Sequence, residues 1–68
     1  MKPKNWWIKE RYNPQLGVYY VAIGLLSIAA AKRAEKSLYG ANIMHRYESV
    51  EAYEARLAEL RANGKLVR

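Results

Sequence analysis

The stretch "RYNPQLGVYYVAIGLLSIAAAKR", residues 11–33, decides how this chain is expected to fold. Twenty consecutive residues within it carry no charge. Asn13 is a suitable helix N-cap, and Pro14 would then occupy the first helical position, where its missing N–H is not needed. No strong helix breaker follows before Gly40, so the sequence predicts a helix over residues 14–39.

The helix predicted over residues 14–39 is long enough to cross a membrane. At about 1.5 Å per residue it would extend roughly 39 Å, more than the ~30 Å hydrocarbon core of a bilayer. Seven strongly apolar side chains favour insertion by roughly 2–4 kcal/mol, and these are Leu16, Val18, Val21, Ile23, Leu25, Leu26 and Ile28. The sequence therefore predicts an all-α protein whose main element is a transmembrane helix.

The net charge of +6 is divided between the two flanks of the uncharged stretch. Residues 1–12 and residues 32–46 each carry a net charge of +3, and residues 47–68 are neutral. Basic and aromatic residues on both sides of an apolar segment are typical of anchors at the membrane interface. We expect such anchors at Trp6, Trp7, Tyr12, Lys32, Arg33 and Lys36, with Lys2, Lys4, Lys9 and Arg11 adding to the first flank.

Small residues recur along the predicted transmembrane helix. In a membrane, small side chains let helix backbones approach closely and so support packing between helices. The expected helix-packing residues are Gly17, Gly24, Ser27 and Ala31.

A second, amphipathic helix is predicted over residues 49–63, after a linker at residues 40–48. Ser49 is a suitable N-cap, and Asn63 and Gly64 are typical of a helix C-terminus. An apolar stripe at helical spacing would pack on the chain's own first helix or the bilayer surface, or dock on a partner protein. We expect docking through Val50, Tyr53, Leu57 and Leu60.

The sequence therefore divides into four segments. They are a basic aromatic segment (1–12), a transmembrane helix with a polar extension (13–39), the linker (40–48) and the amphipathic helix with its tail (49–68).

No pattern of catalytic or metal-ligating residues is present in the sequence. The chain has no cysteine and one histidine, His45, which excludes disulfides and thiolate metal sites. Its four glycines are scattered and form no phosphate-binding loop. We therefore expect neither an enzyme nor a metal or cofactor site.

The layout resembles that of the small accessory subunits of mitochondrial respiratory-chain complexes and ATP synthase. The residues that carry the likeness are "NWWIKERYNPQLGVYY", the apolar stretch through Ala31, and "KRAEKSLYG" after it. Among these families the membrane region (Fo) of ATP synthase is the best match, at the level of architecture. The resemblance implies a non-catalytic, single-pass subunit of the mitochondrial inner membrane that stabilises or helps assemble a proton-transporting complex.

The resemblance implies partners as well. They would be other subunits of the complex and the lipid bilayer, including cardiolipin bound by the basic flank. No nucleic acid is expected, and the orientation in the membrane stays open because the two flanks carry equal charge.

Two alternatives remain open at the level of sequence. The chain could be an accessory subunit of NADH dehydrogenase or cytochrome oxidase instead. It could also be a small soluble basic protein that binds RNA, such as a ribosomal protein. In that case Trp6, Trp7 and the lysines would contact RNA by stacking and by phosphate contacts.

Overall fold

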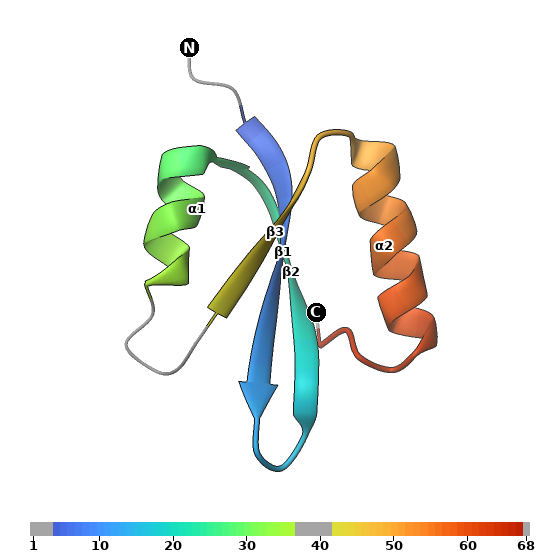
Figure 1. Ribbon diagram of the computed structural model, residues 1–68. Helices are drawn as coiled ribbons and strands as arrows, with labels where there is room; N and C mark the ends of the chain where they lie inside the picture. The colour runs from blue at the N-terminus through green and yellow to red at the C-terminus, as the bar shows by residue number, and fades with distance from the viewer. Residues whose placement is uncertain (1–3, 37–41, 68) are drawn as a thin grey trace.

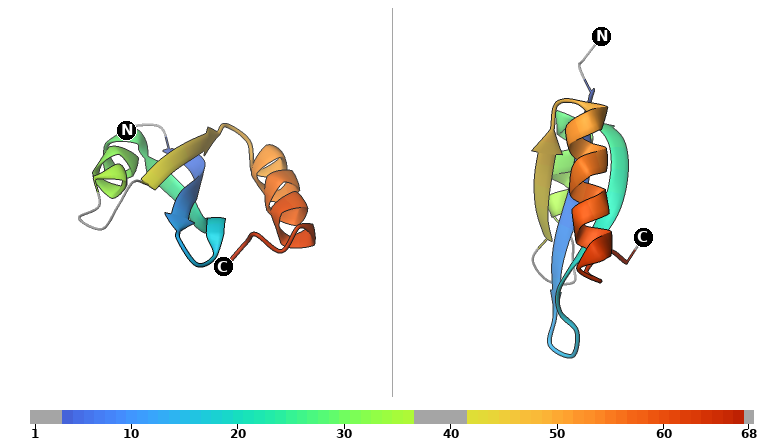
Figure 2. Two further views of the ribbon diagram at one scale, coloured as in Figure 1. Left: turned by 60° about the horizontal axis from the view of Figure 1, so that its bottom comes forward. Right: turned by 90° about the vertical axis from the view of Figure 1, so that its right-hand side faces the viewer.

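The computed structural model describes residues 4–36 and 42–67, which form a three-stranded antiparallel sheet with a helix on each face (Figure 1). Its elements are β1 (Lys4–Asn13), β2 (Gly17–Ser27), α1 (Ile28–Glu35), β3 (Asn42–Tyr47) and α2 (Val50–Ala62). β1 is the central strand, and the order across the sheet is β2-β1-β3. Figure 2 shows α1 and α2 on opposite sides of the sheet.

The all-α fold predicted from the sequence is wrong. Residues 17–27 of the expected transmembrane helix form β2, and only residues 28–35 are helical. Residues 37–39 of that helix lie outside the described part of the chain. Among the described residues, no helix combines the length and the apolar character that crossing a membrane requires. The expected linker at 40–48 contains β3.

A turn at Asn13 explains why β1 and β2 form a hairpin. The Asn13 Oδ1 accepts hydrogen bonds from the backbone N–H groups of Gln15 and Leu16, at 2.8 and 3.2 Å. An N-cap uses this same side-chain contact to start a helix. Here Gly17 follows with φ +80°, a conformation that glycine adopts without a steric cost, and the chain turns back into β2.

Helices on both faces of the sheet explain why the central strand, β1, has a buried side chain on each face. Side chains alternate between the two faces along a strand. On β1, Ile8 faces α2 and is 1% exposed, whereas Trp7 faces α1 and is 7% exposed. β2, at the edge of the sheet, is a continuous apolar run whose side chains are partly buried on both faces, and it lacks the polar alternation of a half-exposed strand.

The face of the sheet covered by α2 holds the larger core cluster. Ile8 packs there with Tyr53, Leu57 and Leu60 of α2. The Trp6 ring adds to it, with its centroid 5.0 Å from that of Tyr53.

The helix predicted over residues 49–63 is present as α2. The Ser49 hydroxyl accepts a hydrogen bond from the Ala52 N–H at 3.1 Å, and Asn63 is the C-cap. The cap residues identified in the sequence therefore mark both ends of this helix.

The face covered by α1 holds a second cluster, formed by Trp7, Ala31 and Met44. The Trp7 indole Nε1–H donates to the Leu26 carbonyl at 3.0 Å, which satisfies the polar atom of a buried ring. The Ser27 hydroxyl caps α1 by accepting a hydrogen bond from the Ala30 N–H at 3.2 Å. β2 therefore leads directly into α1.

A β-bulge on β2 adjusts which side chains face α1. Trp7 pairs with Gly24 and Ile8 with Ala22, so Ile23 is the extra residue. It packs into the α1-side cluster, and Gly24 has φ +97°. Bulges of this kind bend the strand and redirect its side chains.

Candidate functional site

The small residues expected to pack helices together do not share a helix. Gly17 opens β2, Gly24 forms part of the bulge, and Ser27 is the N-cap of α1. Ala31 lies on the buried side of α1, beside Trp7, and so packs within the chain.

The aromatic residues expected at a membrane interface occupy different environments. Trp6 and Trp7 lie on opposite faces of the sheet, each packed against a core cluster. Tyr12 is 68% exposed near the end of the β1–β2 hairpin. Lys32 and Arg33 are exposed on α1, and Lys2 lies outside the described residues.

The stripe expected to dock on a partner packs on the chain's own sheet instead. Tyr53, Leu57 and Leu60 are all buried against Ile8, and only Val50 is substantially exposed, at 38%. Three of the four residues of the stripe therefore pack within the chain, but they pack on the sheet and not on another helix.

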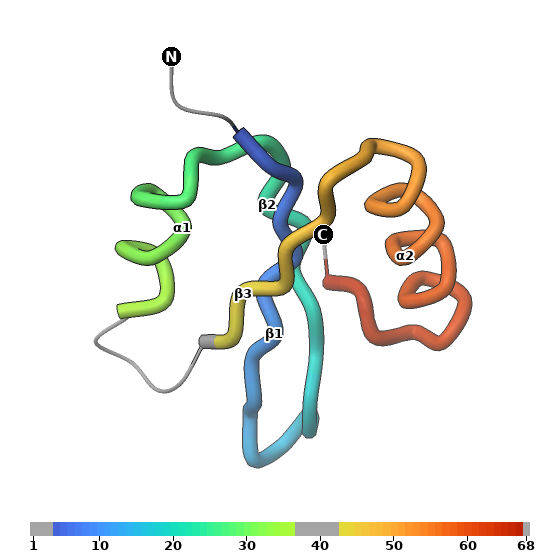
Figure 3. Tube along the Cα trace, turned by 45° about the horizontal axis from the view of Figure 1, so that its top comes forward, coloured from blue at the N-terminus to red at the C-terminus, as the bar shows by residue number. Residues whose placement is uncertain are grey.

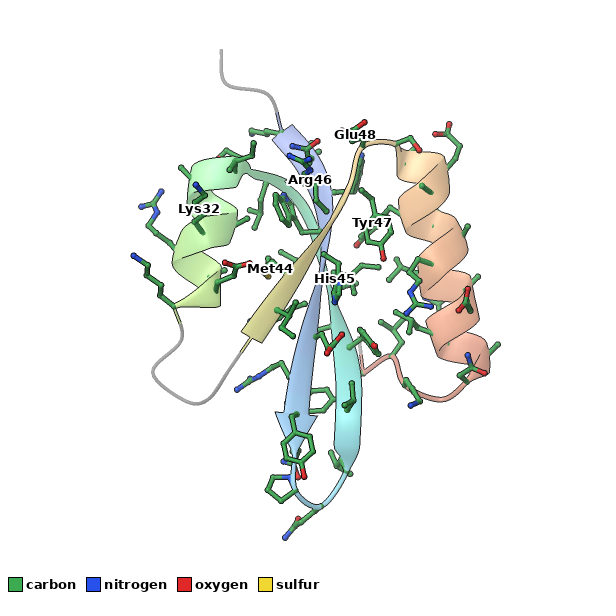
Figure 4. The ribbon with its side chains drawn as sticks, in the orientation of Figure 1. Lys32, Met44, His45, Arg46, Tyr47 and Glu48 are labelled. Carbon is green, nitrogen blue, oxygen red and sulfur yellow. The ribbon has the colours of Figure 1, made fainter. Side chains whose placement is uncertain are left out.

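Basic residues gather on the α1 side of the sheet. Lys9 and Arg11 share this side with Trp7 because they are alternate residues of one strand. Arg46 of β3 is the direct cross-strand partner of Trp7 and shares its face (Figure 4). We define the basic surface as Lys9, Arg11, Lys32, Arg33, Lys36 and Arg46.

Acidic residues are concentrated on the other side. Glu35 is the one acidic residue of α1. On the α2 side, by contrast, α2 itself carries three glutamates against two arginines, and Glu10 of β1 faces the same way. With Lys4 and Lys65 also on the α2 side, the sheet therefore separates a positively charged side from one whose positive and negative charges are mixed.

A cluster of polar side chains lies on the α2 side and was missed by the sequence analysis. The His45 Nε2 is 2.9 Å from the Glu10 Oε1, and the His45 and Tyr20 ring centroids are 6.4 Å apart. The Arg56 Cζ lies 5.6 Å from the centroid of the Tyr20 ring, and its Nη1 pairs with Glu59. The register pairing of Glu10 with Tyr20, and of Ile8 with His45 on β3, brings these residues together from positions far apart in the sequence.

This polar cluster ties three strands and a helix together. Glu10 pairs with His45 and Arg56 with Glu59, and the described residues contain no group of three His, Cys, Asp or Glu side chains that could hold a metal ion. Burial and the neighbouring Glu10 carboxylate raise the pKa of Tyr20, while the Arg56 guanidinium opposes this shift. Burial, together with Glu54, likewise raises the pKa of Tyr53, against a hydrogen bond to the backbone of Gly24.

The raised tyrosine pKa values predict that the fold weakens at alkaline pH. The folded protein keeps the protons of Tyr20 and Tyr53 at pH values where the unfolded chain, with a pKa of 10.0, releases them. Their contribution to the free energy of unfolding is therefore complete below pH 10.0 and is lost as the pH rises through the folded values. Urea unfolding measured between about pH 8 and 11.5 should show this loss.

Two variants test which side chains cause the loss of stability at alkaline pH. Tyr53→Phe should reduce the fall in stability above pH 10.0, because the titrating hydroxyl is gone. Tyr12→Phe, at the exposed hairpin, serves as the matched control. An identical fall in the wild type and Tyr53→Phe would contradict the role of Tyr53.

Comparison of the chain with protein-family models, curated proteins and solved structures finds no match. The charges and packing of the described residues are therefore the basis on which a function can be argued.

Proposed function

We propose that this protein binds nucleic acid through the basic surface. The observation that carries this proposal is the separation of charge across the sheet, with six basic residues and one acidic residue, Glu35, on the α1 side. Clustered Lys and Arg on one face are typical of proteins that bind a phosphate backbone. The class of protein supported best is thus a small basic nucleic-acid-binding module.

The arrangement of α1 supports contact with a polyanion. Lys32 and Arg33 lie in the last turn of α1, and Lys36 follows directly as its C-cap residue. These side chains are exposed, whereas Ala31 on the opposite side of the helix is buried at 1%. The helix and its C-cap residue therefore present three cations outward, while the apolar side of the helix holds it on the sheet.

Phosphate contacts, and not stacking on tryptophan, should dominate the binding. Trp7 is buried, and Trp6 packs on Tyr53 in the core, so neither ring is presented as a platform for a base. Of the contacts expected for a soluble RNA-binding protein, the phosphate contacts of the basic residues are therefore still available, whereas stacking of bases on the tryptophans is not.

The main reason for expecting an accessory subunit of a membrane complex no longer applies. It depended on a transmembrane helix over residues 14–39, and β2 and α1 occupy most of that segment. The proposal of nucleic-acid binding needs no such helix.

Fluorescence anisotropy with a labelled nucleic-acid duplex, titrated at several salt concentrations, tests the proposal. The triple variant Lys32→Gln/Arg33→Gln/Lys36→Gln should bind roughly 100-fold more weakly at 0.1 M salt. Its slope of log affinity against log salt should be smaller by about 2–3, since each lost phosphate contact contributes about 0.9.

A second triple variant controls for net charge alone. Lys4→Gln/Arg61→Gln/Lys65→Gln removes the same number of charges outside the basic surface. It should change the affinity by less than about fivefold, the effect of screened charges at a distance. Equal losses in both variants, or no binding by the wild type, would overturn the proposal.

A further inference from the structure

We propose that the end of the β1–β2 hairpin is an arm that enters the major groove of duplex DNA. We define the hairpin arm as residues 11–19. The inference rests on the proposed function, because the arm would act together with the basic surface. It adds the identity of the partner, namely B-form DNA in preference to RNA.

The hairpin arm projects beyond both helices, as Figures 1 and 3 show. Its apolar side chains are consequently uncovered: Tyr12 is 68% exposed, Leu16 71% and Val18 38%. The two helices cover Ile8 and Trp7, but neither is long enough to reach the turn. An exposed apolar segment at one end of a small protein indicates a contact site.

The hairpin arm is ordered by its own hydrogen bonds. Its strands pair Arg11 with Tyr19, Tyr12 with Val18 and Asn13 with Gly17. The Asn13 side chain closes the turn, as described above. The arm is therefore a preformed two-stranded ribbon, which lowers the entropic cost of binding.

The dimensions of this ribbon select among nucleic acids. The paired strands lie ~4.8 Å apart, and the two residue steps from Arg11 to Asn13 give about 7 Å of paired strand before the turn at residues 14–16. The major groove of B-form DNA, ≈12 Å wide and ≈8.5 Å deep, admits a two-stranded ribbon whose side chains reach the base edges. The major groove of A-form RNA is deep and too narrow for side chains to read.

The side chains of the hairpin arm suit base edges in that groove. Gln15 is exposed at the turn, and a glutamine amide can pair with adenine. Tyr12 and Leu16 supply apolar surface of the kind that contacts the thymine methyl group. Such contacts add base recognition to the phosphate contacts of the basic surface.

The basic surface continues onto the base of the hairpin arm. Lys9 and Arg11 extend from β1 on the α1 side, and α1 runs toward the same end of the molecule with Lys32 and Arg33 in its last turn (Figure 1). With the arm in the groove, these cations face the phosphates along its border. Charge complementarity therefore favours DNA as the occupant over an apolar protein partner.

The test is a competition assay in which a labelled 20-base-pair DNA duplex is displaced by unlabelled DNA or RNA duplex of the same sequence. The wild type should prefer DNA at least tenfold. The variant Tyr12→Ser/Leu16→Ser should lose this preference and bind DNA at least tenfold more weakly, with its salt slope and RNA affinity unchanged. Val67→Ser, which alters an apolar residue 58% exposed outside the arm, is the matched control.

A second variant keeps the test valid if the serine pair disturbs the turn. Gln15→Glu places a negative charge at an exposed side chain and should weaken DNA binding at least tenfold without changing the thermal melt. Equal affinity for DNA and RNA, or DNA binding unaffected by both variants, would overturn the role proposed for the hairpin arm. The proposed function would still stand. Failure of the wild type to bind either duplex would overturn both.

Discussion

Ile8→Ala should lower the free energy of unfolding by about 2–4 kcal/mol, the usual cost of removing a large side chain from a close-packed core. Ile8 is 1% exposed on the central strand and packs against Tyr53, Leu57 and Leu60. For a domain of this size, such a loss lowers the melting temperature by roughly 10 °C or more. Thermal unfolding followed by circular dichroism measures it.

Ile43→Ala is the matched control for this prediction. Ile43 lies on the neighbouring strand, β3, and is 50% exposed. Its truncation removes less buried surface, so the expected loss is below about 1.5 kcal/mol. Similar losses at both positions would show that α2 does not cover Ile8 as described.

Trp7→Ala should be comparably damaging, with an expected loss of about 3–5 kcal/mol. The indole is 7% exposed, packs with Ala31 and Met44, and donates to the Leu26 carbonyl. The change therefore leaves a cavity beneath α1 and removes the partner of a carbonyl group. Urea unfolding of the variant measures the loss.

Trp7→Phe separates the two contributions. A phenyl ring fills much of the space but cannot donate to Leu26, so the expected loss is smaller, about 1–3 kcal/mol. The fluorescence of Trp7, observed in a Trp6→Phe background, should also resist quenching by acrylamide. Ready quenching would place Trp7 at the surface, as a membrane-interface anchor would require, and would contradict the packing of α1.

The sequence identified α2 because the signals for this helix are local. Ser49, the helical spacing of Tyr53, Leu57 and Leu60, and Asn63 at the end act within one segment. No other part of the chain is needed to recognise them.

The transmembrane prediction failed because two patterns were ambiguous. Asn13 followed by Pro14 can start a helix or a turn, since the Asn side chain accepts backbone hydrogen bonds in both. β2 packs partly buried apolar side chains on both faces of the sheet, so it lacked the alternation of a half-exposed strand. The β-branched and aromatic residues between Gly17 and Ile23 were the signal that favoured a strand.

The candidate site depends on pairing between strands, which the sequence alone did not reveal. The basic residues were counted as two flanks of a membrane segment, although the sheet places Lys9 and Arg46 on one side. The contact between Glu10 and His45 likewise requires the pairing of β1 with β3. Both features depend on the pairing register between strands that are distant in the sequence.

The most direct test of the central claim is an NMR titration of the uniformly ¹⁵N-labelled chain with a short DNA duplex. We expect strand-like shifts over residues 17–27 before DNA is added. Addition of DNA should then change only the shifts of the basic surface and the hairpin arm, with α2 unaffected. Helical shifts throughout residues 17–27, or changes centred on the glutamates of α2, would contradict the central claim.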